Sequence, residues 1–395
     1  MTTATPSHLH SAGPDLGDAL SWLTDAAVAR ADAGLHRDPY VRDSAAPLIN
    51  LASNDYLGLS THPDVIAGAH AALDEWGTGS TSSRLVCGTT RLHADLEDEL
   101  ADFLGTPAAL VFSSGYLANV GAITALAGRG SLIVSDTGTH ASLIDGCRLS
   151  RARVVVVERG DHAAVRAALA GRTEPRALVV TDSIYSVDGE PAPIRELYAA
   201  AHDHGAALLV DEAHALGVRG PGGAGLVAEC GLAGARDLVV TGVLSKSFGS
   251  QGGLVAGSAV LRDHLIDTAR TFIFDTGLNP AAAGAALAAL RVLRADPGYP
   301  DRLRANVIRL ARRCGAPTPS AAVISLIVGD PQPAVAAAQA CRDRGVLVGC
   351  FRPPSVEPGT SRLRLTVRAD LDDATVDHVG DVVLESLREV GAQIR

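Results

Sequence analysis

The chain of 395 residues contains a single lysine, Lys246. All the other residues among its 34 lysines and arginines are arginines. Arginine stays charged under biological conditions, whereas lysine can lose its proton and form a Schiff base with an aldehyde. A bias in base composition explains the missing lysines, but not why one remains where an apolar run enters a turn of small residues (239–253). Because burial there would lower the pKa of the amine, we interpret Lys246 as a catalytic residue.

A carboxylate precedes this lysine by 35 residues, at the end of an apolar segment. Residues 208–210 lead into Asp211, and His214 follows. A lysine that holds an aldehyde and a carboxylate that keeps a pyridine nitrogen protonated are the two groups that pyridoxal phosphate (PLP) requires. Asp211 alone would be explained as a helix N-cap or a structural ion pair. Together with Lys246 it predicts a PLP site.

Three further turns follow predicted strands. Residues 113–116, which include Gly115 and Tyr116, predict a tight turn and a helix start whose amides suit a phosphate, although ordinary capping also explains them. His140 lies beyond a strand, where an imidazole could stack on a flat ring or serve a structural role. Ser186 offers a hydroxyl donor beyond another strand, but the Asp188-Gly189 pair that follows also fits a plain turn.

Short apolar segments alternate with amphipathic helices over the central part of the chain. Their Val, Leu and Ile content is typical of strands covered on both faces. The expected strands are 109–112, 132–135, 154–158, 177–181, 207–211, 238–241 and 254–257. Expected helices between them include 93–104, 163–169 and 194–204. This rhythm predicts a mainly parallel seven-stranded α/β sheet with helices on both sides, which binds ligands at the carboxyl ends of its strands.

A different pattern follows the expected helix 280–295. The segments 324–328, 334–344, 347–349 and 362–367 indicate a smaller α+β domain. We therefore expect an N-terminal segment (1–48), a large PLP-binding domain (49–289) and a small C-terminal domain (290–395).

Composition excludes several classes of protein. Hydrophobic residues make up 47% and charged residues 20%, and no apolar stretch reaches the roughly 18 residues of a membrane span. Residues 1–17 lack a basic segment followed by an apolar one, which argues against secretion. The six cysteines form no CxxC pair or metal-ligand cluster, so we expect no metal and a reducing cytoplasm. The net charge of −10 argues against nucleic acid as a partner.

The order of these motifs resembles the α-oxoamine synthases, a family of fold-type I PLP-dependent enzymes. The resemblance runs from residues 50–59 (NLASNDYLGL) to residues 352–366 (RPPSVEPGTSRLRLT) and leaves chiefly the first 45 residues outside. Between these ends lie 77–80 (GTGS), Ser83-Arg84, Gly88, His93, Leu96-Glu97, 211–214 (DEAH), 219–225 (RGPGGAG) and the lysine motif.

The resemblance implies roles for the cofactor-binding residues. Lys246 would hold PLP and then remove the α-proton of the amino acid, and Asp211 would pair with the pyridine nitrogen. The other expected cofactor contacts are His214 and Ser186 at the ring oxygen, His140 stacked on the ring, Gly115 and Tyr116 at the phosphate, and Thr276.

The resemblance also implies substrate-binding residues. Arg364 matches the position that grips the amino-acid carboxylate, for which a bidentate arginine is suited. Asn54 would orient the acyl-transfer intermediate, and Arg37 and Ser355 lie where acyl-chain or product contacts occur.

Two positions depart from the family pattern. Val243 replaces the usual threonine that bonds the phosphate three residues before the lysine, and Thr241 on the same strand face could compensate in part. Asp275 replaces a usual serine in the segment 272–277, which in the family reaches the cofactor of the neighbouring subunit. We expect weaker retention of PLP.

The implied reaction is the decarboxylative condensation of L-alanine with pimeloyl-CoA or a pimeloyl carrier thioester in biotin biosynthesis, by a cytoplasmic homodimer. The run 219–225 favours this member over glycine-using relatives. Two alternatives stay open: a glycine-dependent synthase such as 2-amino-3-ketobutyrate CoA ligase, and a catalytically silent PLP-fold subunit that stabilises a partner.

Overall fold

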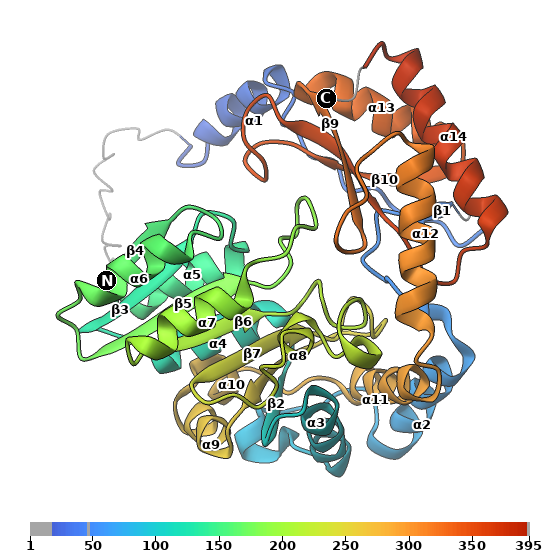
Figure 1. Cartoon of the computed structure of the whole chain (residues 1–395). Coiled ribbons are helices and arrows are strands. Elements are labelled where there is room, and N and C mark those ends of the chain that lie inside the picture. The colour runs from blue at the N-terminus through green and yellow to red at the C-terminus, as the bar shows by residue number, and fades with distance from the viewer. Residues whose placement is uncertain (1–17, 46–47, 393–395) are drawn as a thin grey trace, which may run out of the picture.

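The computed structural model describes residues 18–45 and 48–392 and contains two sheets (Figure 1). The strands are β1 (Ile49–Leu51), β2 (Ala108–Phe112), β3 (Ser131–Asp136), β4 (Arg153–Val157), β5 (Arg176–Asp182), β6 (Ala207–Asp211), β7 (Leu238–Val243), β8 (Gly253–Gly257), β9 (Val323–Gly329), β10 (Val346–Phe351) and β11 (Ser361–Thr366). The helices are α1 (Trp22–Asp32), α2 (Pro63–Trp76), α3 (Arg91–Leu104), α4 (Gly115–Leu126), α5 (Ala141–Ser150), α6 (His162–Ala170), α7 (Ile194–Asp203), α8 (Leu226–Glu229), α9 (Ala259–Thr268), α10 (Arg270–Ile273), α11 (Pro280–Ala295), α12 (Tyr299–Arg313), α13 (Pro331–Asp343) and α14 (Asp373–Glu389).

The larger sheet has seven strands in the order β2-β8-β7-β6-β5-β3-β4. Only β8 runs against the others, because it pairs in an antiparallel way with both β2 and β7. The predicted mainly parallel α/β sheet is confirmed, and all seven expected strands are present. The main difference is β7, which continues two residues beyond the expected end, to Val243.

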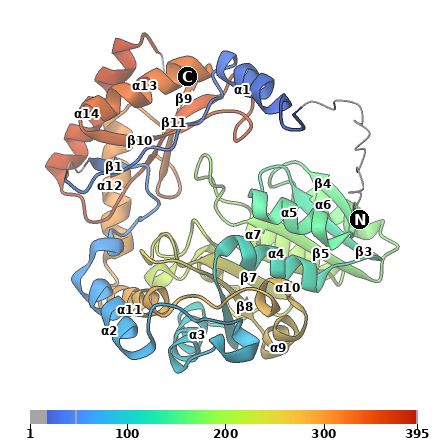
Figure 2. The same ribbon diagram turned by 180° about the vertical axis from the view of Figure 1, so that it is seen from behind.

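Both faces of this sheet are buried, as its apolar strands require. Alternate residues point to opposite faces: Leu132 and Val134 belong to one apolar cluster, and Ile133 belongs to the other. The first cluster includes residues of α3, α6 and α7, and the second includes residues of α4, α5, α9 and α10. Figure 2 shows the molecule from the side of α4, α9 and α10. Helices on both faces leave the carboxyl edge of the strands as the place for a site.

The smaller sheet has the order β1-β10-β11-β9 and packs with α12, α13 and α14. Its strand β1 pairs in parallel with β10, Ile49 opposite Val346, although it precedes the large sheet in the chain. The domain boundaries stay a prediction, but this pairing places residues 49–51, which we had assigned to the large domain, in the smaller sheet. The sequence of β1 is too short to indicate which sheet it joins.

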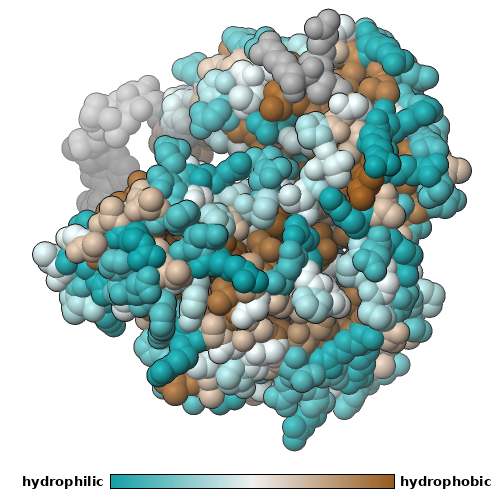
Figure 3. All heavy atoms as spheres, viewed as in Figure 1, coloured by the Kyte–Doolittle hydropathy of each residue, from teal (hydrophilic) through white to brown (hydrophobic). Residues whose placement is uncertain are grey.

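Hydrophilic side chains dominate the face of the molecule seen in Figure 3. Ion pairs such as Arg309–Asp377, which joins α12 to α14, are partly exposed. In the part of the chain that the structure describes, no helix combines the length and the apolar character needed to cross a membrane.

Candidate active site

Lys246 lies in the loop that follows β7, with its amine directed at the end of β6. Its Nζ is 2.7 Å from Nε2 of His214. Burial lowers the pKa of Lys246 to about 8, against the opposing effect of the Asp211 charge. Burial and the Lys246 charge also hold the pKa of His214 well below its usual range. The site therefore contains an amine that is partly neutral near physiological pH beside a neutral imidazole.

The other nitrogen of His214 contacts Tyr56, a residue that the sequence analysis did not single out. The Tyr56 hydroxyl is fully buried, 2.5 Å from Nδ1 of His214, and it donates to Oδ1 of Asn54 at 3.3 Å. The same Asn54 oxygen accepts from Nη1 of Arg364 at 3.0 Å. A continuous chain of side chains thus joins Lys246 to Arg364. Tyr56 fixes the orientation of the imidazole between them.

Asp211 ends β6 and is held by two donors. The Ala213 amide donates to Oδ1 at 2.9 Å, and Nδ2 of Asn119, on α4, donates to Oδ2 at 2.7 Å. Asn119 also donates to Oγ of Ser142 at 2.9 Å, and this hydroxyl lies 2.7 Å from Nδ1 of His140. His140 and Asp211 are therefore joined through two neutral side chains, as expected for groups that would contact the same ring.

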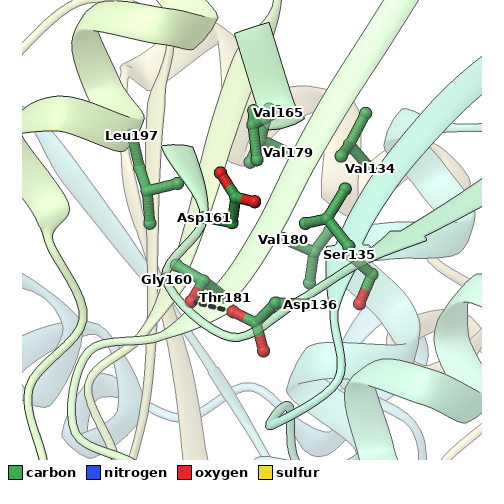
Figure 4. A pocket seen from close by; sticks show the side chains of 11 residues that line it. Val134, Ser135, Asp136, Gly160, Asp161, Val165, Val179, Val180, Thr181 and Leu197 are labelled. Atoms are coloured by element: carbon green, nitrogen blue, oxygen red, sulfur yellow. Dashed lines mark hydrogen bonds between the residues drawn. The ribbon is translucent and has the colours of Figure 1, made fainter. Parts of the chain in front are cut away.

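Two buried acids set the turn that carries His140. Oδ2 of Asp182 accepts the His140 amide at 2.8 Å, and burial raises the pKa of Asp182 well above its usual range. Asp136 accepts the Gly138 amide and the Thr181 hydroxyl, each at 2.8 Å. Figure 4 shows the Asp136 and Thr181 side chains directed at one another at the ends of β3 and β5. The turn between β3 and α5 is thereby fixed from both ends.

The predicted phosphate turn forms the start of α4. Ser114 caps the helix by accepting the Leu117 amide at 3.2 Å, and Gly115 is its first residue. A Cβ at Gly115 would lie 2.1 Å from Cγ1 of Val243, so only glycine fits there. The Tyr116 hydroxyl donates to Asp145 on α5, and burial has no part in holding it, because 44% of this residue is exposed. The first amides of α4 remain available to an anion.

The two departures from the family pattern meet at this turn. Val243 packs directly on Gly115. The Thr241 hydroxyl is fully buried and has no hydrogen-bond partner among the described residues, so a phosphate cannot reach it in this conformation. Asp275 accepts a hydrogen bond from Ser113, the residue that precedes the capping serine. Compared with the family pattern, this turn has the additional carboxylate of Asp275 and lacks the threonine hydroxyl at position 243.

Thr276 does not reach the site within this chain. It is exposed and pairs through its main chain with Ser83. Its expected contact with PLP stays a prediction that requires the cofactor of a second subunit.

Arg364 lies on β11 of the smaller sheet and faces the larger one. Its Nε donates to the main-chain oxygen of Ser186 at 2.8 Å, and its guanidinium lies 5.2 Å from the Phe351 ring. Nη1 also donates to Thr366 at 3.2 Å. No carboxylate of the described residues is bonded to this guanidinium, so it can bind one from a substrate. Ser186 contacts Arg364 through its carbonyl, and the expected contact of its hydroxyl with the ring oxygen of PLP stays a prediction.

Arg37 and Ser355 lie on two segments that Arg352 brings together. Arg352 donates to the carbonyl oxygens of Gly34 at 2.5 Å and His36 at 3.3 Å, and its own carbonyl accepts the Ser355 amide at 3.0 Å. Both Arg37 and Ser355 are exposed. Their expected contacts with the acyl chain or the product stay a prediction.

These groups fit PLP. An amine of lowered pKa, a buried carboxylate and the start of α4 occur at one edge of the sheet, as a phosphorylated pyridine aldehyde requires. Only glycine fits at position 115, where a Cβ would collide with Val243, so the first turn of α4 can pack closely on the end of β7. The sequence analysis did not identify Tyr56, Asn119 and Asp182, because a single polar residue forms no recognisable sequence pattern. The available hint was position: these residues lie in the 50–59 motif, just after the phosphate turn and at a strand end.

Comparison with known proteins agrees with this arrangement. Residues 46–383 match the family model for aminotransferase class I and II. The chain is 58% identical to the 8-amino-7-oxononanoate synthase of Mycolicibacterium gilvum over 369 residues, covering 93% of this chain and 97% of the relative. It is 60% identical to the enzyme of the same name from Mycobacterium marinum over 353 residues, covering 89% and 90%.

Solved structures show the same fold. A serine palmitoyltransferase from S. paucimobilis, with a bound PLP–myriocin aldimine, is 32% identical with a TM-score of 0.87 and covers 94% of this chain and 98% of its own. An 8-amino-7-oxononanoate synthase from Francisella tularensis is 24% identical with a TM-score of 0.73 and covers 87% and 98%.

Proposed function

Because this chain belongs to the class I and II aminotransferases, and within them to the 8-amino-7-oxononanoate synthases, we propose that it joins L-alanine to a pimeloyl thioester. Carbon dioxide and the free thiol leave, and the product is 8-amino-7-oxononanoate for biotin biosynthesis. The observation that carries this proposal is the convergence of Lys246, Asp211 and Arg364 in a chain so similar to those synthases.

The cofactor is PLP, which when bound supplies an electron sink for the negative charge that develops at the alanine α-carbon. Lys246 would hold its aldehyde, and Asp211 would keep its ring nitrogen protonated. The further contacts that we propose are His214 and Ser186 at the ring oxygen, His140 on the ring face, the main chain of Gly115 and Tyr116 at the phosphate, and Thr276 from the second subunit.

The proton chemistry is assigned to Nζ of Lys246. With a pKa of about 8, a useful fraction of this amine is neutral at pH 7 and can accept the α-proton of alanine. The lowered pKa of His214 keeps this imidazole neutral, so it places no positive charge beside the amine when the amine accepts a proton. Tyr56 holds the imidazole in place through Nδ1. The same amine can return the proton after carbon dioxide has left.

Substrate binding is assigned to residues at the junction of the two sheets. Arg364 would bind the alanine carboxylate in a bidentate way, and Asn54, already bonded to Arg364, would orient the acyl group. Arg37 and Ser355, which Arg352 brings together, would contact the acyl chain or product.

We also propose a cytoplasmic homodimer. All six cysteines are free, as suits a reducing compartment. Leu85, Val86 and Phe274 are exposed apolar side chains close in sequence to Ser83 and Thr276, two residues that pair through their main chains, and Asp275 bonds to Ser113 next to the phosphate turn. A second subunit would cover these apolar side chains and bring Thr276 to its cofactor. Light scattering or sedimentation would measure the mass of the assembly.

A substrate panel tests the reaction. Alanine, glycine and serine are each combined with pimeloyl-CoA and acetyl-CoA, and released CoA, released carbon dioxide and product mass are measured. We expect turnover with alanine and pimeloyl-CoA and a product of the mass of 8-amino-7-oxononanoate. Preferred turnover of glycine with acetyl-CoA would replace this proposal by the 2-amino-3-ketobutyrate ligase alternative.

A second experiment tests whether the site holds PLP covalently. The protein is saturated with PLP, reduced with borohydride and mapped by mass spectrometry. Because Lys246 is the only lysine, a pyridoxyl-lysine peptide must contain it. An unlabelled protein would leave the catalytically silent subunit as the remaining interpretation.

A further inference from the structure

A second guanidinium on β11 has no role in the site described above. Arg362 is two residues before Arg364, so both side chains project from the same face of the strand, toward the larger sheet. Arg362 is only 9% exposed. Its Nε donates to the Thr360 carbonyl at 2.9 Å, and its Nη1 donates to the Ser325 hydroxyl at 3.3 Å. Neither partner is charged.

A buried guanidinium without a carboxylate is an unfavourable arrangement for a purely structural residue. Removing its charge from water is unfavourable unless an opposite charge offsets the lost hydration. Among residues 18–45 and 48–392 no carboxylate bonds to Arg362. Its Nη2 makes no hydrogen bond either, and this atom is not shut off from solvent. The remaining donor is therefore without a partner among the described residues and keeps contact with solvent.

The acid whose charge acts on Arg362 is Asp188, and this acid already has a partner. Asp188 lies on the turn that packs on the smaller sheet, where a Cβ at Gly189 would lie 3.2 Å from the Val323 carbonyl. Asp188 accepts from Nη1 of Arg159 at 2.6 Å, and the Arg159 guanidinium lies 4.7 Å from the Tyr185 ring. Asp188, Arg159 and Arg362 thus lie close enough for their charges to interact, and one carboxylate against two guanidinium groups leaves a net charge of +1 in this region.

From this arrangement we propose that Arg362 and the Ser325 hydroxyl bind an anionic group of the acyl donor. The inference rests on the proposed function, in which two anionic substrates meet and Arg364 binds the carboxylate of the first. Two sources supply such a group: the distal carboxylate of the pimeloyl chain and the phosphates of CoA.

The chain is long enough for the carboxylate to be the source. Residues two apart on a strand are about 7 Å apart. Six carbon–carbon bonds of about 1.5 Å span at most about 8 Å, so a pimeloyl chain whose thioester meets an alanine held by Arg364 can extend as far as Arg362.

The first test is equilibrium binding to the PLP-loaded protein, with pimelate and CoA as separate probes. A charge-assisted hydrogen bond is worth enough to weaken binding about 10- to 100-fold when it is lost. We expect that loss for at least one probe in Arg362→Gln and a smaller loss in Arg362→Lys, which keeps the charge. Arg312→Gln, an exposed arginine of α12, is the matched control and should bind both probes normally. Unchanged binding of both probes in Arg362→Gln overturns the proposal.

The second test uses steady-state kinetics with three donors: pimeloyl-CoA, heptanoyl-CoA, which lacks the distal carboxylate, and the pimeloyl thioester of N-acetylcysteamine, which lacks the phosphates. If the carboxylate binds Arg362, the variant raises KM for both pimeloyl donors and not for heptanoyl-CoA. If phosphate binds, KM rises for both CoA donors and not for the third. Equal KM increases for all donors and for alanine, with weaker PLP binding, would show a structural role and refute the site. A wild type that fails to turn over alanine with any pimeloyl donor would refute the proposed function instead, whatever the binding test shows.

Discussion

Val243 packs on Gly115, so a substitution at position 243 should change the affinity for PLP. A Cβ at Gly115 would lie 2.1 Å from a Val243 methyl group, so residue 243 touches the start of α4, where the phosphate is expected. Threonine has nearly the shape of valine, with a hydroxyl in place of one methyl group. Val243→Thr therefore adds a donor at the phosphate without changing the volume of the site.

The expected magnitude follows from the new hydrogen bond. A hydrogen bond to a charged phosphate contributes about 1.5–3 kcal/mol. Since about 1.4 kcal/mol changes an equilibrium constant tenfold, we expect the Kd for PLP to fall about 10- to 100-fold.

Equilibrium dialysis and fluorescence titration of the apoprotein with PLP measure this change. Val156→Thr is the matched control, because it makes the same exchange on the exposed strand β4, where Val156 is 61% exposed. The control should leave the Kd unchanged. If Val243→Thr binds PLP no more tightly than the wild type, residue 243 does not face the phosphate and the reasoning from Gly115 is wrong.

Three further changes should have measurable effects. Asp275→Asn removes a carboxylate beside the phosphate turn, so the Kd for PLP should fall about three- to tenfold. The difference in Kd between variant and wild type should shrink in high salt, and a difference that does not depend on salt would contradict this. Only the neutral amine of Lys246 attacks an aldehyde, and its pKa is about 8. The rate of PLP attachment, measured by trapping with borohydride, should therefore fall tenfold per pH unit below 8. A midpoint of the pH–rate profile near 10.5 would contradict the burial of the amine. Tyr56→Phe removes the hydroxyl that holds His214, so kcat, measured by steady-state kinetics, should fall about tenfold or more. The free energy of unfolding, measured by urea denaturation, should fall by about 1–3 kcal/mol. An unchanged kcat would assign Tyr56 to stability alone.

The larger sheet could be predicted because its strands carry a strong local signal. Each is a short run of Val, Leu and Ile between helices, and burial on both faces requires such a composition. The three residues of β1 carry no comparable signal, and their pairing with β10 depends on a segment almost 300 residues away. The sequence therefore predicted what each segment forms better than which sheet it joins.

The candidate site shows the same division. Lys246 and Asp211 were found because lysine is unique in this chain and because a carboxylate at a strand end is unusual. Asn119, by contrast, lies in an apolar helix and gains its meaning only from contact with Asp211, 92 residues away, at 2.7 Å. Hydrogen bonds between distant segments leave no periodic pattern, so such supporting residues become visible only in three dimensions. The expected help of Thr241 failed for a related reason, since strand alternation gives the face but not the burial of a hydroxyl.

The cofactor-binding residues and the substrate-binding arginine belong to different sheets. Lys246, Asp211 and the start of α4 belong to the larger sheet, and the bonds of Asp211 and His140 close within it. Arg364 belongs to the smaller sheet and reaches the larger one through the Ser186 carbonyl. Cofactor affinity and substrate affinity should therefore respond to different substitutions. Changes on β11 should raise KM and leave the Kd for PLP nearly unchanged, whereas changes around Gly115 should do the reverse, because the start of α4 makes no hydrogen bond to Arg364 among the described residues.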